Sequence, residues 1–172
     1  MIKTDAPPEL STLCTGCSAC ANICPRDAIS MNWSPSGFLT PAVNLEACVH
    51  CGLCTKTCPD LNAPARPPQA FDEPRAYAAW ALDEAVRLNS SSGGVFTILA
   101  RHILAQGGVV YGVAWNTDRE LSVRHVRLDS LPELKLLNGS KYLQADPGHA
   151  YRDIKKDLKD CLLYTSDAAD EL

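Results

Sequence analysis

The pattern of hydrophobic and polar residues divides the chain into two parts of different character. In the first part the apolar runs are short and interrupted by cysteines. There AISMNW and FLT flank the turn residues SPSG, which predicts a small β-hairpin with Gly37 in a position that tolerates unusual backbone angles. The cysteine-rich runs on either side are predicted to be loops with short helices.

After residue 75 the apolar stretches become longer and follow the periods of helices and strands. RAYAAWAL is predicted as a strand, VFTILARHILAQ as an amphipathic helix that the following GG ends, and VVYGVAW as a buried strand. LSVRHVRL alternates as a further strand. SLPELKLL and GHAYRDIKKDLK predict helices, the first with Ser130 as its cap and Pro132 in its first turn.

Proline marks the boundary between the two parts, since ten of the 12 prolines precede residue 75. The segment from Pro64 to Pro74 has the stiff, polar composition of an extended linker. We therefore predict an N-terminal domain over residues 1–63, a Pro-rich linker over 64–74 and a second domain over 75–160.

Residues 161–172, CLLYTSDAADEL, do not continue this pattern. They closely resemble the translation of a transposase adaptor used in sequencing libraries, so we predict a non-native tail and leave it out of the fold prediction. On this interpretation the natural protein is longer and the chain is a fragment. The alternative is an ordinary solvent-exposed C-terminal segment.

Composition and charge narrow the class of protein. The chain has 172 residues, is 46% hydrophobic and carries a formal net charge of -4 without a Lys/Arg-rich run, so no nucleic-acid partner is expected. No secretory signal is recognised, and the longest uncharged apolar stretch is too short to span a membrane. We expect a cytoplasmic protein, in which nine cysteines are metal ligands rather than disulfides.

Eight of these cysteines form an internal repeat with an offset of 34 residues. Each run has the spacing Cys-x-x-Cys-x-x-Cys-x-x-x-Cys-Pro. The repeat superimposes Cys14, Cys17, Cys20, Cys24 and Pro25 on Cys48, Cys51, Cys54, Cys58 and Pro59.

This spacing is typical of bacterial ferredoxins with two [4Fe-4S] clusters, in which the fourth cysteine of each run serves the other cluster. Small residues near the cysteines, such as Gly16 and Gly52, let the backbone approach a cluster so that N–H groups can point at sulfur. We assign Cys14, Cys17, Cys20 and Cys58 to one cluster, and Cys48, Cys51, Cys54 and Cys24 to the other.

Other interpretations of the cysteines explain less. Structural zinc needs only two Cys-x-x-Cys pairs and leaves the third cysteine and the Cys-Pro ending unexplained. Disulfides within so dense a run would have poor geometry. His50 lies between two ligands and could tune a cluster, although we favour an exposed loop residue.

Two segments of the second domain are candidates for binding a cofactor. Ser91 and Ser92 can cap a helix whose first turn contains Gly93 and Gly94, which would leave backbone N–H groups for a phosphate or a flavin edge. The alternative is that the glycines only permit close packing. In GSKYLQA, Lys141 could pair with an anion and Tyr142 could stack, or the two are a surface lysine and a half-buried tyrosine.

These segments also carry a resemblance. NSSSGGVFTILARHIL, GGVVYGVAW, VRHVRL and LNGSKYLQA, in this order, resemble the N-terminal domain of the coenzyme F420 hydrogenase/dehydrogenase beta-subunit family. The resemblance implies an iron-sulfur flavoprotein in which clusters exchange electrons with FAD, and FAD with a two-electron carrier such as F420. It implies an α+β fold, with a 2[4Fe-4S] ferredoxin domain followed by a truncated α/β domain, and FAD in the full-length protein.

We therefore expect part of an oxidoreductase that relays single electrons between a ferredoxin-like partner, or other subunits, and a flavin or F420-type carrier. The cofactors would perform the chemistry, so no residue is nominated as catalytic, and the fragment alone would only transfer electrons. A stand-alone electron-transfer module whose second domain docks a partner is the alternative. A zinc-stabilised interaction domain is a third possibility.

Overall fold

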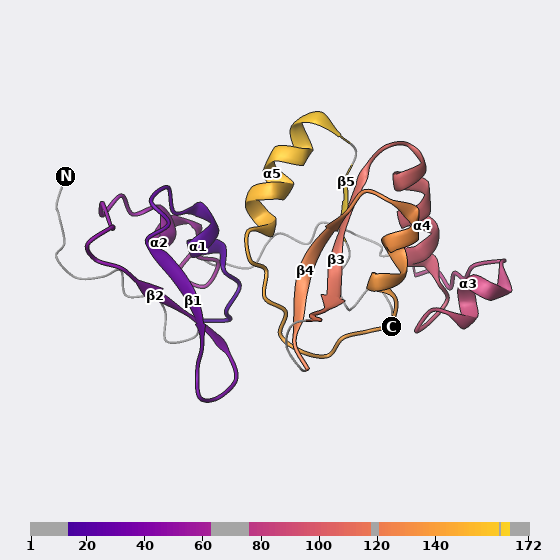
Figure 1. Ribbon diagram of the computed structural model, residues 1–172, viewed down its shortest axis with the longest axis horizontal. Coiled ribbons are helices and arrows are strands. Elements are labelled where there is room, and N and C mark those ends of the chain that lie inside the picture. The colour runs from indigo at the N-terminus through magenta and orange to yellow at the C-terminus, as the bar shows by residue number, and fades with distance from the viewer. Residues whose placement is uncertain (1–13, 63–75, 118–120, 162, 166–172) are drawn as a thin grey trace. The chain divides into compact units, whose positions relative to one another are not determined.

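The computed structural model describes residues 14–62, 76–117, 121–161 and 163–165 (Figure 1). The chain forms two compact units, Met1–Pro74 and Arg75–Leu172. The linker predicted over residues 64–74 lies outside the described residues. Helices and strands occur in both units, which confirms the α+β fold class.

The first unit is a hairpin with one short helix before it and one after it. Its elements are α1 (Ala19–Ile23), β1 (Ile29–Trp33), β2 (Leu39–Val43) and α2 (Leu53–Thr57). The two strands are antiparallel, with Ile29 opposite Val43 and Trp33 opposite Leu39. Gly37 has a φ of 83°, the left-handed conformation that favours glycine in a tight turn. The predicted hairpin is thus confirmed.

The second unit is a three-stranded sheet with helices on both faces. Its elements are α3 (Glu84–Leu88), α4 (Val95–Ala105), β3 (Val109–Trp115), β4 (Val123–Leu128), the 3-10 helix η1 (Leu131–Leu137), α5 (Ala150–Asp160) and β5 (Leu163–Thr165). The strand order is β4-β3-β5, with β3 antiparallel to β4 and parallel to β5. No helix among the described residues is long and apolar enough to cross a membrane.

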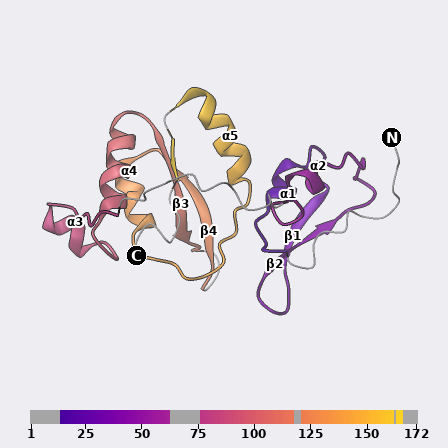
Figure 2. The same cartoon turned by 180° about the vertical axis from the view of Figure 1, so that it is seen from behind.

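Alternate residues of β3 supply the two cores of this unit. Val110 and Ala114 pack with α4 and η1, whereas Val109 and Tyr111 pack with α5. The two views accordingly show α4 on one side of β3 and α5 on the other (Figures 1 and 2). Gly112 leaves room for Leu137, because a Cβ at this glycine would lie 2.8 Å from Leu137 Cδ1.

Two of the predicted elements differ from the structure. The described part of the strand predicted from residue 75 is irregular, and its apolar side chains Tyr77, Trp80 and Leu82 are 79%, 60% and 90% exposed. An apolar run without a neighbouring strand does not make a strand. SLPELKLL forms a 3-10 helix instead of an α-helix, and the three-residue period of this helix turns Leu134 and Leu137 to the same buried side.

The cap predicted for that helix is also different. Ser130 makes no hydrogen bond to the backbone of η1, and its hydroxyl contacts the Glu133 carboxylate at 2.5 Å. Tyr164 of β5 stacks on Phe96 of α4 with 5.9 Å between ring centroids. Part of the segment that we left out of the fold prediction therefore joins the sheet. Its non-native origin stays a prediction.

Candidate metal centre

The sequence repeat is also a repeat of backbone conformation. Ser18 and Gly52, which are 34 residues apart, precede α1 and α2 with φ values of 61° and 73°. Cys24 and Cys58 end these helices with nearly identical angles, φ -66° and ψ 116° against φ -67° and ψ 118°. Each of these cysteines therefore leaves its helix in the same direction relative to the repeat that contains it.

Backbone N–H groups point at several of the sulfur atoms. Gly16 N lies 3.4 Å from Cys14 Sγ, and at the equivalent position His50 N lies 3.5 Å from Cys48 Sγ. Gly16 and His50 also share a positive φ, at 71° and 50°. Such N–H donors stabilise negative charge on sulfur, as the spacing predicts.

The eight cysteines line two separate cavities, each with four of them. The first cysteine site consists of Cys14, Cys17, Cys20 and Cys58, around a cavity of about 20 Å³. The second cysteine site consists of Cys24, Cys48, Cys51 and Cys54, around a cavity of about 130 Å³. Each cavity combines three cysteines of one repeat with the fourth cysteine of the other. The assignment of these thiols to two clusters stays a prediction.

The chemistry of these cavities fits an iron-sulfur cluster. Four thiols surround each cavity, apolar residues such as Met31 and Ile29 form much of the remaining wall, and N–H groups face the sulfurs. Among the described residues no three His, Cys, Asp or Glu side chains converge closely enough to hold a single metal ion.

Burial is uneven among the cysteines. Cys20 is 8% exposed, and burial raises the pKa of its thiol to about 11. Loading a metal must therefore displace a proton from this sulfur. Cys161 lies in the other unit, where its thiol donates to the Asp157 carbonyl oxygen at 3.2 Å, and it lines neither cavity.

Comparison with known families agrees with both units. Residues 13–61 match the model of the 4Fe-4S dicluster domain, and residues 76–149 match that of the coenzyme F420 hydrogenase/dehydrogenase beta subunit N-terminal domain. The resemblance to the coenzyme F420 hydrogenase/dehydrogenase beta-subunit family is thereby confirmed. The dicluster match supports two [4Fe-4S] clusters in the first unit.

Three curated proteins are similar to part of this chain. An iron-sulfur protein of the CoB–CoM heterodisulfide reductase of Methanocaldococcus jannaschii is 34% identical over 27% of this chain and 9% of its own length. A polyferredoxin-like protein of the same organism is 38% identical over 29% of this chain and 34% of its own. The ferredoxin-type protein NapF of Haemophilus influenzae is 40% identical over 27% and 26%. The chain thus spans about a third or less of these relatives.

In the beta-subunit-like unit, the predicted serine cap of α4 is absent. The helix begins after Gly94, which has a φ of 77°, and no side chain caps it. A Cβ at Gly94 would lie 2.9 Å from Val86 Cγ1, and one at Gly93 would lie 2.5 Å from the Ala79 carbonyl oxygen. These glycines are therefore needed for close packing, which was the alternative interpretation.

The two candidate cofactor-binding segments nevertheless meet. Ser140 N donates to Ser91 Oγ at 2.8 Å, across 49 residues of sequence. Lys141 is 6% exposed, and its Nζ donates to the carbonyl oxygens of Leu137 and Asn138 at 2.9 and 2.8 Å. It is therefore a buried residue that satisfies the end of η1, whereas Tyr142 is 77% exposed.

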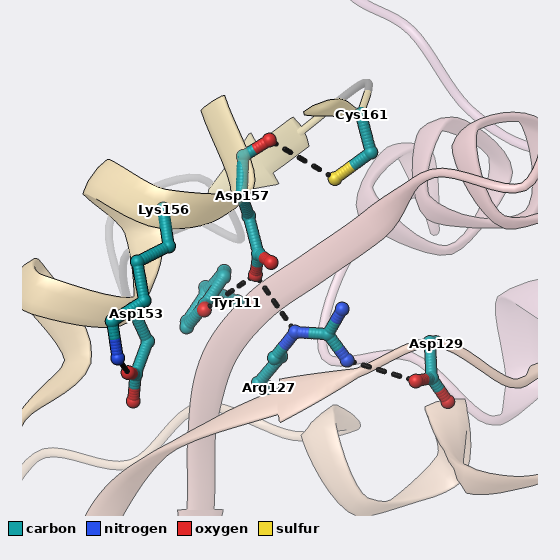
Figure 3. A network of polar contacts seen from close by, with 7 residues as sticks. All are labelled: Tyr111, Arg127, Asp129, Asp153, Lys156, Asp157 and Cys161. Atoms are coloured by element: carbon teal, nitrogen blue, oxygen red, sulfur yellow. Dashed lines mark hydrogen bonds and ion pairs between the residues drawn. The ribbon is translucent and has the colours of Figure 1, made fainter. Parts of the chain in front are cut away.

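A polar network that sequence analysis missed connects α5 with the sheet (Figure 3). The hydroxyl of Tyr111 and Nε of Arg127 both donate to Asp157 Oδ2, at 2.8 and 2.7 Å, and Nη1 of Arg127 donates to Asp129 Oδ2 at 2.8 Å. The Arg127 hydrogen bond, followed by that of Tyr111, lowers the pKa of Asp157. Burial, followed by the Asp157 hydrogen bond, raises the pKa of Tyr111. Nothing local in the sequence links residues so far apart.

Proposed function

We propose that the chain is the N-terminal part of an oxidoreductase component that relays single electrons through two [4Fe-4S] clusters. The electrons pass between a ferredoxin-like redox partner, or other subunits, and a flavin or F420-type two-electron carrier. Cys24 of the first repeat lines the cavity of the second repeat, and Cys58 of the second repeat lines that of the first. This exchange carries the proposal, because it gives each cavity a set of four thiols.

In this proposal the cysteines hold the clusters and the protein controls their surroundings. Bound clusters supply one-electron chemistry. Gly16 and His50 direct N–H groups at the sulfurs, and the apolar cavity walls limit the access of water. Since the cytosol keeps thiols reduced, we place the protein in the cytoplasm.

The second unit supports a flavin site in the longer protein. The contact of Ser140 with Ser91 brings the SSGG and GSKY segments together at the start of α4, whose first N–H groups have no helical partner. Tyr142 is exposed and available to stack on a ring, while Lys141 fixes the backbone that carries it. In this proposal FAD binds between these two segments.

The alternative is a stand-alone electron-transfer module whose second unit docks a partner. The packing of Gly93 and Gly94 and the engagement of Lys141 with carbonyl groups favour it, because these residues already have a role in the fold. Both proposed functions use the two clusters, but only the oxidoreductase binds a flavin.

Anaerobic purification followed by assays for iron, sulfide and flavin tests the proposal. The chain and a version extended by the natural gene beyond Asp160 are compared. About eight irons per chain, four for each cluster, support the relay, and stoichiometric flavin in the extended protein supports the oxidoreductase. Four irons or fewer after reconstitution overturn the two-cluster assignment. Eight irons without flavin leave the alternative.

A further inference from the structure

The two cysteine sites are related by the repeat, but the charged residues that line them differ in sign. Arg26 follows Pro25 and lines the second site. Its equivalent 34 residues later is Asp60, which follows Pro59 and lines the first site. A permanent positive charge at one site therefore occupies the position that a negative charge occupies at the other.

Hydrogen bonding to the fourth cysteine of each repeat, Cys24 or Cys58, is unequal as well. Ala28 N donates to Cys24 Sγ at 3.3 Å, which adds an N–H to the sulfurs of the second site. At the equivalent position, Asn62 N donates to the carbonyl oxygen of Cys58 at 3.1 Å. The same backbone group thus faces a sulfur in one site and a carbonyl oxygen in the other.

Burial differs most at one pair of equivalent cysteines. Cys20 of the first site is buried, whereas its equivalent Cys54 in the second site is partly exposed. Cys14 and its equivalent Cys48 differ in the opposite sense, exposed against partly exposed. Reducing a cluster adds one negative charge, which burial destabilises and which nearby positive charges and N–H donors stabilise. The charge, the hydrogen bond and the burial of Cys20 therefore favour reduction at the second site.

We propose that the second cysteine site holds the cluster of higher reduction potential and that Arg26 and Asp60 set this order. The proposal rests on the ligand assignment made under the proposed function. With clusters bound, one electron would leave the cluster of the first site and reach the cluster of the second site, without bond breakage or proton transfer. A redox partner would supply the electron, and because electrons move toward the higher potential, the downhill direction would run from the first site to the second.

The other charged residues in the described part of this unit do not reverse the argument. Asp27, Glu46 and Lys56 are exposed, as Arg26 is, but unlike Arg26 and Asp60 they line neither cavity. His50 lines the second site together with Arg26. Any positive charge on His50 would therefore act on the second site, as the charge of Arg26 does.

An anaerobic redox titration of the full chain, followed by electron paramagnetic resonance, tests the order. Iron and sulfide are measured first, because a chain with fewer than two clusters contradicts the proposed function and not this inference. With two clusters present, we expect two potentials. Arg26→Gln should lower the higher potential and Asp60→Asn should raise the lower one, each by about tenfold in the reduction equilibrium, which is about 59 mV.

The repeat provides matched controls. Exchange of the two charges in R26D/D60R should bring the potentials together or reverse them, while Asp27→Asn, adjacent to Arg26 but outside the cavity, should shift neither by as much. The shifts should shrink as salt increases. Equal potentials in the unaltered chain, or an Arg26→Gln shift confined to the lower potential, would overturn the proposal.

Discussion

Tyr111 on β3 and Asp157 on α5 are joined by a 2.8 Å hydrogen bond across 46 residues of sequence, and the tyrosine ring is almost completely buried. Arg127 of β4 donates to the same carboxylate oxygen. One acidic residue thus connects the last helix of the second unit with two strands of its sheet (Figure 3). The fit of α5 to this face depends on it.

Removing the tyrosine hydroxyl should loosen this connection without creating a cavity. We expect Tyr111→Phe to destabilise the second unit by about 1 kcal/mol, the net value of a typical hydrogen bond. Amide hydrogen exchange of residues 109–115, measured by mass spectrometry on the full chain, would report it as faster opening. Asp153→Asn breaks an exposed pair with Lys156 and should have a smaller effect. An equal effect of the two variants would contradict this prediction.

The same carboxylate should make the second unit sensitive to acid. Its folded-state pKa lies below its usual value of 3.8, so its stabilisation is complete above that value and is lost as the pH falls through the folded-state pKa. As the pH falls from neutral into this acidic range, the protection of β3 amides, corrected for the intrinsic exchange rate at each pH, should therefore decrease more in the unaltered chain than in Asp157→Asn. Parallel pH profiles for the two proteins would contradict the role given to Asp157.

Cysteine substitutions can verify the crossing of the fourth ligands. Because Cys24 lines the second site, Cys24→Ser should abolish the same electron paramagnetic resonance signal as Cys48→Ser. The signal that Cys20→Ser removes should remain. Iron should fall to about four per chain in each variant. Cys161→Ser is the control and should keep the full iron content. A Cys24→Ser variant that matches Cys20→Ser would show that each repeat keeps its own cysteines.

The backbone between the first two cysteines of each run offers a pair of opposite variants. His50 has a positive φ that costs a non-glycine residue about 1–2 kcal/mol, while its equivalent Gly16 adopts such a conformation freely. His50→Gly should slow the loss of visible absorbance in denaturant, and Gly16→Ala should accelerate it. If both variants accelerate the loss, the His50 side chain stabilises the folded protein by more than its positive φ destabilises it.

Gly112 and Leu137 form a size-matched pair that a double-mutant cycle can test. Gly112→Ala places a methyl group against the leucine, and overpacking of this kind typically costs about 1–3 kcal/mol. Leu137→Ala alone leaves a cavity. In the double variant the added methyl group should no longer destabilise, so the two effects on chemical denaturation should not add. Additive effects would mean that the glycine serves a different purpose.

Sequence predicted the features that depend on neighbouring residues. The cysteine spacing predicted which thiols share a cavity, and the SPSG turn located the β1–β2 hairpin. The periods of α4, β3, β4 and α5 were long enough to be recognised. These features are local, or are repeated so that each copy supports the other.

Features that depend on distant partners were missed. Tyr77 and Trp80 lie in an apolar run that predicts a strand, but no strand pairs with the described part of this segment. Lys141 looks like a surface residue until the carbonyl groups at the end of η1 are placed around it. The glycines before α4 suggested an open binding loop, whereas Ala79 and Val86 lie against them. Composition carries no information about such contacts.

The interleaving of the two repeats also constrains how the protein is made. The second cavity draws on Cys24 but lacks its last cysteine until residue 54 is synthesised, and the first cavity waits for residue 58. Through most of the synthesis of this domain the ribosome therefore presents only incomplete sets of thiols. Both sets are then completed almost together, so cofactor insertion must follow synthesis of the whole domain and cannot proceed one repeat at a time.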